Sequence, residues 1–264
     1  MSEEFEVNIE HTAGFDVFNR DNTQFDIYEV KTFVIDFVKK NGKRRSVEYT
    51  SFLVARGHWK NTVVNIIRNE FLSILKTNLE DCKNEKSACL KTIEKLCSIC
   101  TNIHGGASMD FVLFNHKTSG KWLTSIGICY TFVYANAKTS LVSQTHDYPS
   151  TFGSYIRESI KEGSTTYEDR SSTHFTTKDA EYYSNVTHMI GGDYLKVKHE
   201  PYFKKLPKDI TSILIGTKRA FENINIDEVF TKGINVTHKP SAFSQSETTY
   251  IHVIFKNFKK TVTA

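Results

Sequence analysis

The residues best placed to do chemistry lie at the end of one predicted strand, in the segment Ser51-Phe-Leu-Val-Ala-Arg-Gly-His-Trp59. The apolar residues in this segment predict a buried strand that delivers Arg56, Gly57 and His58 to a tight turn, with a helix following. A carboxylate, a metal ligand or a phosphate-binding loop is expected at such a strand end, and this chain has a cation there instead. Either Arg56 does chemistry itself or it replaces a residue that did.

Other reactive residue types give weaker signals. Cys97 and Cys100 have a spacing that suits redox or zinc chemistry, but both lie on the predicted apolar face of a helix, without a second cysteine pair at zinc spacing. Buried core thiols are therefore the better interpretation. The pair Gly105-Gly106 lacks the helix that follows a phosphate loop. A histidine-based hydrolase is a minor alternative, because no serine or cysteine nucleophile stands at a recognisable turn. The histidines that could approach one face are His58, His104, His146 and His188.

Composition restricts the class of protein. The chain has 264 residues, of which 39% are hydrophobic and 12% aromatic, and it contains four prolines and no linker-like segment, so residues 1–264 are predicted to form a single domain. The net charge of +4 is mild, and the basic residues at 39–45 are interpreted as a solvated hairpin turn, so no nucleic-acid partner is expected. No apolar run approaches the ~18 residues of a membrane helix. The odd number of cysteines, five, favours reduced thiols in the cytoplasm.

The order of predicted elements indicates an α+β fold with antiparallel strands rather than a parallel βαβ fold. A hairpin with an Asn41-Gly42 turn joins strands at 27–38 and 47–55. Amphipathic helices are predicted at 61–76 and 85–101. The remaining predicted elements are strands at 109–114, 122–134 (with a candidate break at Gly127), 139–143, 194–203, 212–215 and 250–258, and helices at 155–162 and 226–231.

A set of short motifs runs through residues 10 to 258 in a recognisable order. They are Asn19-Arg-Asp-Asn-Thr-Gln-Phe-Asp26, Arg56-Gly-His-Trp59, Gly105-Gly-Ala-Ser-Met109, Gly127-Ile-Cys-Tyr130, His146-Asp-Tyr-Pro149, Tyr155–Gly163, His188-Met-Ile-Gly-Gly192, Ile213–Glu222, Asn225–Phe230 and Glu247-Thr248. Together they resemble the metal-dependent protein serine/threonine phosphatases of type 2C, the PPM family. The resemblance implies a β-sandwich of two antiparallel sheets flanked by pairs of antiparallel helices, in α-β-β-α layers.

The resemblance also implies that most metal-binding carboxylates are lost. Active members of the family hold two Mg²⁺ or Mn²⁺ ions with carboxylate oxygens, and a bridging water attacks the phosphoserine. The corresponding positions here are Gln24, Phe25, Arg56, Gly57, Gly192, Lys218 and Glu247. Only Glu247 is acidic, and Gly57 would supply a backbone carbonyl. A cation ~4 Å from a metal charge costs about 4 kcal/mol at an effective dielectric of 20. No metal, cofactor or catalytic residue is therefore predicted, and a shifted Asp193 would not restore the site.

The cations at these positions have two interpretations. Arg56, Lys218 and Arg219 could form a metal-free phosphate cradle, since guanidinium and ammonium groups bind phosphate directly. Alternatively, Arg56 and Lys218 form structural ion pairs in place of the metal. The candidate acidic partners are Asp193, Glu222 and Glu247. We favour the structural ion pairs.

The expected function is that of a catalytically inactive pseudophosphatase, which acts as a cytoplasmic adaptor or regulatory subunit in signalling. The resemblance extends in kind to a degenerate family member that binds and activates the TGF-β-activated kinase, so it implies a protein partner such as a kinase or a phosphoprotein. A metal-free phosphopeptide-binding module that uses the degenerate cleft is the alternative. A residual phosphatase is the third hypothesis, and no membrane partner is expected.

Overall fold

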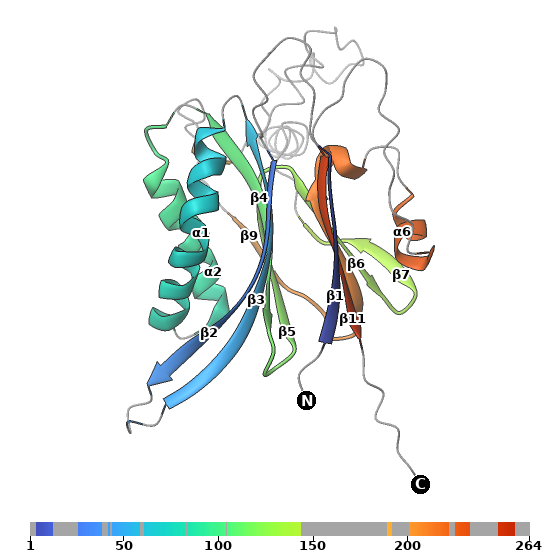
Figure 1. Cartoon of the computed structure of the whole chain (residues 1–264), viewed down its shortest axis with the longest axis horizontal. Coiled ribbons are helices and arrows are strands. Elements are labelled where there is room, and N and C mark those ends of the chain that lie inside the picture. The colour runs from blue at the N-terminus through green and yellow to red at the C-terminus, as the bar shows by residue number, and fades with distance from the viewer. Residues whose placement is uncertain are drawn as a thin grey trace, which may run out of the picture.

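Two antiparallel sheets lie at the centre of the molecule (Figure 1). The computed structural model describes residues 4–12, 26–38, 42, 44–58, 61–82, 84–103, 105–143, 189–191, 201–221, 225–232 and 248–256. The first sheet has the order β1-β11-β10-β6-β7 and the second has the order β2-β3-β4-β5-β9, with β8 paired to β4. The sandwich and its antiparallel pairing confirm the predicted α+β fold.

The strands of the first sheet are β1 (Glu4–Thr12), β11 (Thr248–Lys256), β10 (Ile210–Thr217), β6 (Cys129–Ala135) and β7 (Lys138–Leu141). Those of the second are β2 (Asp26–Val38), β3 (Arg44–His58), β4 (Gly106–Asn115), β5 (Gly120–Ile126), β9 (Tyr202–Lys205) and β8 (Ile190–Gly191). The helices are α1 (Thr62–Asp81), α2 (Glu85–Ile99) and α6 (Ile226–Lys232), with a 3₁₀ turn, η2, at Lys218–Phe221.

The helices complete the layers on both sides of the sandwich. Figure 1 shows α1 and α2 beside the second sheet and α6 beyond the first sheet. Helix α1 presents apolar residues at helical spacing to the sheet, and among them Phe71 makes an edge-to-face contact with Phe111 of β4, with ring centroids 5.0 Å apart. The predicted helix at 155–162 lies outside the described residues. No helix in the described part of the chain is long and apolar enough to cross a membrane.

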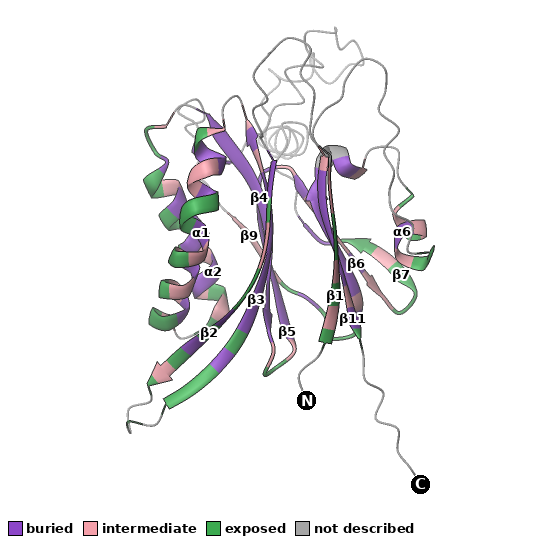
Figure 2. Ribbon diagram, viewed as in Figure 1, coloured by how far each residue is buried: buried purple, intermediate pink, exposed green. Residues whose placement is uncertain are grey.

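The middle of β3 is buried on both faces because the strand lies between the helices and the first sheet (Figure 2). Odd-numbered residues such as Tyr49 and Leu53 face α1 and α2, whereas even-numbered residues such as Phe52 and Val54 face the first sheet. Continuous burial explains why β3 reads as an apolar run rather than as an alternating pattern. Apolar clusters therefore lie on both sides of the second sheet, and a smaller third cluster joins β10 and β11 to η2 and α6.

Most predicted elements are confirmed, and their ends are the main differences. The predicted break at Gly127 separates β5 from β6, and Gly127 has φ +93°, while a Cβ there would lie 2.2 Å from the Ser108 hydroxyl. Strand β3 continues past its predicted end at residue 55 to His58. Strand β9 covers only Tyr202–Lys205 of the predicted strand at 194–203, whose residues 194–200 lie outside the described part. The single domain over 1–264 stays a prediction.

Candidate functional site

The candidate site lies at the end of the sandwich where β2 begins and β3 ends, in the upper part of Figure 1. Strands β4 and β6 begin at the same end, and the backbone N–H of Ile128, just before β6, donates to the Ser108 hydroxyl of β4 at 3.1 Å. A second bond joins the two sheets, from the Thr131 hydroxyl to the Asp110 carboxylate at 2.6 Å. Polar side chains thus fill the space between the sheets at this end.

Arg56 is bound to Asp26 across the β2–β3 pair. The two residues are register partners, and Nη1 of Arg56 lies 3.3 Å from Oδ1 of Asp26. The Asp26 side chain is fully buried, whereas that of Arg56 is 19% exposed. A buried carboxylate needs a compensating charge because its desolvation costs several kcal/mol. Arg56 supplies this charge from the strand end that the sequence analysis singled out.

Asp26 is a partner that the sequence analysis missed. Arg56 forms an ion pair with a carboxylate of β2 that was not among the predicted candidates. Asp193, Glu222 and Glu247 lie outside the described residues, so pairing with them stays a prediction. The motif resemblance assigns the carboxylate positions to Gln24 and Phe25, which directly precede Asp26. Counting the hairpin register outward from the turn at Asn41-Gly42 would have placed Asp26 within one residue of Arg56.

Gly57 and His58 are the last two residues of β3 and pair with β4. They belong to the strand and not to the tight turn that the sequence predicted. Nε2 of His58 lies 2.6 Å from the Ser108 hydroxyl. Burial, together with the charge of Arg56, lowers the pKa of His58 to about 3. His58 is therefore a neutral side chain at physiological pH, and Ser108 is fully buried and hydrogen-bonded. This arrangement holds the strand end in place and presents no nucleophile at the surface.

Asp110 is a second buried carboxylate near this end, and the sequence did not single it out. Burial raises the pKa of Asp110 to about 7, although hydrogen bonds from Ser125 and Thr131 oppose the shift. Burial and the charges of Asp110 and Asp26 raise the pKa of the Cys129 thiol, which shows that both carboxylates lie near this thiol. The thiol is accordingly protonated and unreactive.

The structure describes only some of the other predicted positions. Gln24, Phe25, Gly192 and Glu247 lie outside the described residues. Lys218 and Arg219 begin the η2 turn directly after β10, whose last residue Thr217 pairs with Cys129, but their side chains are also outside the described part. The structure therefore brings together Arg56, Gly57 and Asp26. The juxtaposition of Arg56 with Lys218 and Arg219 stays a prediction.

The described residues do not fit a pair of divalent cations. Asp26 is bound to the Arg56 guanidinium, and Asp110 is a buried carboxyl group whose protonated form is favoured. Within the described ranges, no group of three or more histidine, cysteine, aspartate or glutamate side chains is arranged to hold a metal ion. Two dications would need several unpaired carboxylates, and the described residues at this end do not supply them.

The remaining reactive candidates are structural. All five cysteines are free thiols, and Cys100 is buried in the core as predicted, whereas Cys97 is partly buried and packs against the core. Burial raises the pKa of Cys97 to about 12 and that of Cys100 to about 11. Gly105 has φ +103° and precedes β4, as expected for a strand-entry turn. His104, His146 and His188 lie outside the described residues.

Comparison with solved structures finds the same architecture in serine/threonine phosphatases. The S. agalactiae serine/threonine phosphatase has a TM-score of 0.56 at 12% identity, over 96% of this chain and 100% of that chain. A serine/threonine phosphatase from Staphylococcus aureus has a TM-score of 0.53 at 11% identity, over 97% of each chain. A C. elegans sex determining protein has a TM-score of 0.62 at 12% identity, over 95% of this chain and 64% of that chain. Sequence comparison finds no matching family model and no matching curated protein. The likeness shows the type-2C phosphatase fold.

The ion pair between Arg56 and Asp26 predicts a large loss of stability when one partner is removed. Arg56→Ala should lower the free energy of unfolding by about 3–5 kcal/mol, because it removes the guanidinium that faces the fully buried Asp26 carboxylate. Adding Asp26→Asn should recover much of this loss, since the amide carries no charge. Lys232→Ala is the control, because it breaks an exposed pair with Glu228 and should cost at most ~1 kcal/mol. Urea unfolding measures all four proteins, and equal losses in Arg56→Ala and Lys232→Ala would contradict the prediction.

Asp110 and His58 predict opposite dependences of stability on pH. The folded pKa of Asp110, about 7, exceeds its ordinary 3.8, so its contribution to stability is lost as pH rises from about 4 to 7. The folded pKa of His58, about 3, lies below its ordinary 6.5, so its contribution is lost as pH falls from about 6.5 to 3. Each group contributes a slope of up to about 1.4 kcal/mol per pH unit, and the two slopes oppose each other between about pH 4 and 6.5.

The two contributions can be separated by substitution. Relative to the unmodified protein, Asp110→Asn should gain stability as pH rises through that window, because only the slope of His58 remains. His58→Gln should lose stability as pH rises, because only the slope of Asp110 remains. Urea unfolding at a series of pH values measures both, and parallel curves for the three proteins would refute the assignment.

Proposed function

We propose that this protein is a non-catalytic pseudophosphatase, a folded interaction module that acts as an adaptor or regulatory subunit in signalling. The observation that carries the proposal is the Arg56 guanidinium at the end of β3, bound to the buried Asp26 carboxylate. The type-2C resemblance places a metal-binding carboxylate at position 56. The cation reverses the charge at that position and also neutralises a carboxylate beside it.

The electrostatics make hydrolysis through a metal pair unfavourable. A unit charge that repels another at ~4 Å costs about 4 kcal/mol at an effective dielectric of 20, and a dication doubles that cost. Removing Arg56 would not be sufficient, because Gln24, Phe25, Gly192 and Lys218 also stand where the resemblance places metal ligands. Several independent changes would be needed to rebuild a two-metal site, which supports loss of catalysis.

A protein partner in the cytoplasm fits what is retained. The sandwich is built on apolar clusters formed by the chain's own side chains, so the fold can present a fixed surface. A kinase or a phosphoprotein is the kind of partner that we propose, because the family that the sequence resembles includes a degenerate kinase-binding adaptor. Affinity purification from native lysate, followed by mass spectrometry, would identify the partner.

The proposal predicts no metal-dependent turnover. The purified protein should hydrolyse p-nitrophenyl phosphate in Mn²⁺ no faster than a buffer control, and titration calorimetry should detect no micromolar binding of Mn²⁺, because the carboxylates needed for two dications are replaced. An active type-2C phosphatase measured beside it controls for the assay, and circular dichroism controls for folding. Turnover that depends on Mn²⁺ would overturn the proposal.

A metal-free phosphopeptide reader built from Arg56, Lys218 and Arg219 is the alternative. The Asp26 carboxylate at 3.3 Å argues against it, since it competes with phosphate for the Arg56 guanidinium. We expect a fluorescent phosphoserine peptide and its unphosphorylated form to bind alike, with the same anisotropy curve for Arg56→Lys. A preference for the phosphopeptide that Arg56→Lys weakens would favour the reader over the adaptor without phosphate recognition.

A further inference from the structure

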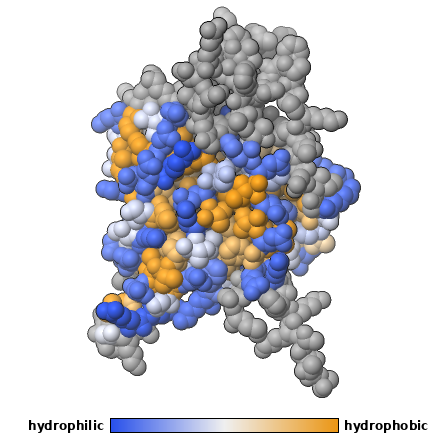
Figure 3. All heavy atoms as spheres, viewed as in Figure 1, coloured by the Kyte–Doolittle hydropathy of each residue, from blue (hydrophilic) through white to orange (hydrophobic). Residues whose placement is uncertain are grey.

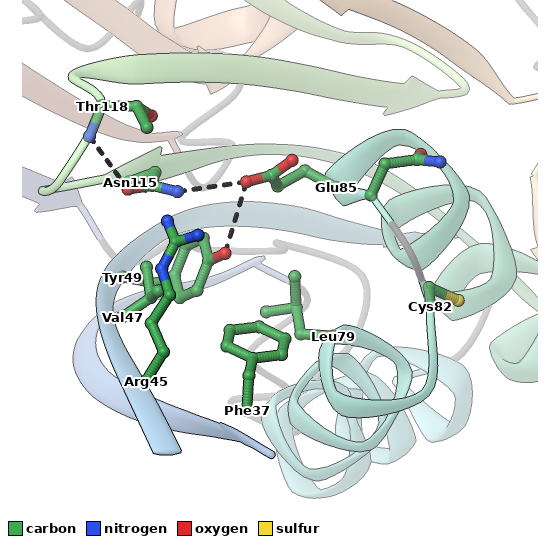
Figure 4. A pocket seen from close by; sticks show the side chains of 10 residues that line it. Phe37, Arg45, Val47, Tyr49, Leu79, Cys82, Glu85, Asn115 and Thr118 are labelled. Atoms are coloured by element: carbon green, nitrogen blue, oxygen red, sulfur yellow. Dashed lines mark hydrogen bonds between the residues drawn. The ribbon is translucent and has the colours of Figure 1, made fainter. Parts of the chain in front are cut away.

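A cavity of about 340 Å³ lies on the helix side of the second sheet, where the β2–β3 hairpin, the α1–α2 connection and the β4–β5 turn meet (Figure 4). Arg45 and Arg56 are eleven residues apart on β3, about 36 Å at ~3.3 Å per residue, so the cavity is remote from the degenerate metal end. Ligand pockets span roughly 300–1,000 Å³, which places this cavity at the size of a small metabolite. Its lining residues are Phe37, Arg45, Val47, Tyr49, Leu79, Cys82, Asn84, Glu85, Asn115 and Thr118.

The Glu85 carboxylate is held in place by two hydrogen bonds, both of which involve the same oxygen atom. The Tyr49 hydroxyl donates to Oε1 of Glu85 at 3.3 Å, and the Asn115 amide donates to the same oxygen at 3.1 Å (Figure 4). Burial and the charge of Glu85 raise the pKa of Tyr49, so its hydroxyl remains a donor. No described residue donates to Oε2 of Glu85. The pocket therefore contains an oriented anionic acceptor that is not fully used.

Arg45 supplies the complementary charge. Its side chain lines the cavity beside Tyr49 (Figure 4), and its charge acts on the Tyr49 hydroxyl. Among the described residues, the Arg45 guanidinium has no carboxylate within ion-pair distance. A planar guanidinium that lacks a protein partner suits bidentate recognition of a carboxylate. Arg45 and Glu85 make the lining electrically neutral overall, with separate positive and negative positions.

The remaining wall is apolar. Val47 and Leu79 are buried, and Phe37 is half-buried and packs against the same core. Figure 4 shows Phe37 and Leu79 on the side of the cavity away from Asn115. An apolar wall opposite a few fixed polar groups is the usual composition of a small-molecule site. It favours a ligand with an aliphatic or aromatic group attached to its charged end.

We propose that this cavity binds a free α-amino acid with an apolar side chain. Its ammonium group binds Oε2 of Glu85, its carboxylate binds Arg45, and its side chain packs on Phe37, Val47 and Leu79. A phosphorylated ligand is disfavoured because the single cation stands near a carboxylate. An uncharged apolar ligand is disfavoured because it would desolvate both charges without pairing them. This inference does not depend on the proposed adaptor function.

Titration calorimetry with three probes tests the assignment. L-leucine should bind the unmodified protein, whereas N-acetyl-L-leucine, which lacks the ammonium group, and L-leucinamide, which lacks the carboxylate, should each bind about tenfold more weakly or less. Arg45→Gln should weaken L-leucine binding by a similar factor but leave L-leucinamide unchanged. Glu85→Gln keeps an acceptor for Tyr49 and Asn115, and should weaken L-leucine while leaving N-acetyl-L-leucine unchanged.

Arg44→Gln is the matched control, because Arg44 is the exposed neighbour of Arg45 on β3 and does not line the cavity. It should bind L-leucine like the unmodified protein. Circular dichroism shows whether each variant is folded. The proposal is overturned if the folded, unmodified protein binds no L-leucine at millimolar concentration. It is also overturned if the three probes bind equally, or if Arg44→Gln weakens binding as much as Arg45→Gln.

Discussion

The ion pair between Arg56 and Asp26 is the interaction on which this end of the sandwich depends. Asp26 opens β2 with a fully buried carboxylate, and the Arg56 guanidinium at 3.3 Å offsets part of the cost of its desolvation. In a metal-binding sandwich, bound dications supply that charge and are lost when the metal dissociates. Here the positive charge comes from the side chain of Arg56 on the neighbouring strand, which cannot dissociate as a metal ion can. The protein's own side chains therefore join the start of β2 to the end of β3.

The neighbouring polar groups follow the same principle, since each uses a protein partner. His58 binds Ser108, whose hydroxyl also accepts the Ile128 N–H, and Asp110 of one sheet accepts from Thr131 of the other. Every such bond satisfies a buried group and removes a donor or acceptor that a substrate would otherwise use. The partner that we propose would therefore bind to the outer surfaces of the sandwich. Figure 3 shows apolar side chains on one such surface, and the exposed large apolar residues of β1 and β2 are Ile9, Tyr28, Val34 and Val38.

The sequence predicts this fold more completely than it predicts the sites, because the two depend on different information. Periodicity within one segment is enough to predict the β2–β3 hairpin and helix α1, and a glycine with positive φ marks the break at Gly127. The Asp26 partner depends on the register between two strands, which motif spacing along one strand does not report. The network of Tyr49, Glu85 and Asn115 joins three distant segments, and each of these residues is unremarkable in its own segment.

Strand β3 explains how the two ends of the molecule can differ in chemistry. Arg56 is even-numbered and faces the first sheet, whereas Arg45 is odd-numbered and lies with the residues that face the helices. The middle of the strand between them is buried on both faces. The two charges are therefore far apart and lie in separate environments. A substitution at Arg56 should consequently leave the helix-side cavity unchanged. Loss of a hydrolytic centre is therefore compatible with a retained or newly acquired ligand site on the opposite face of the same strand.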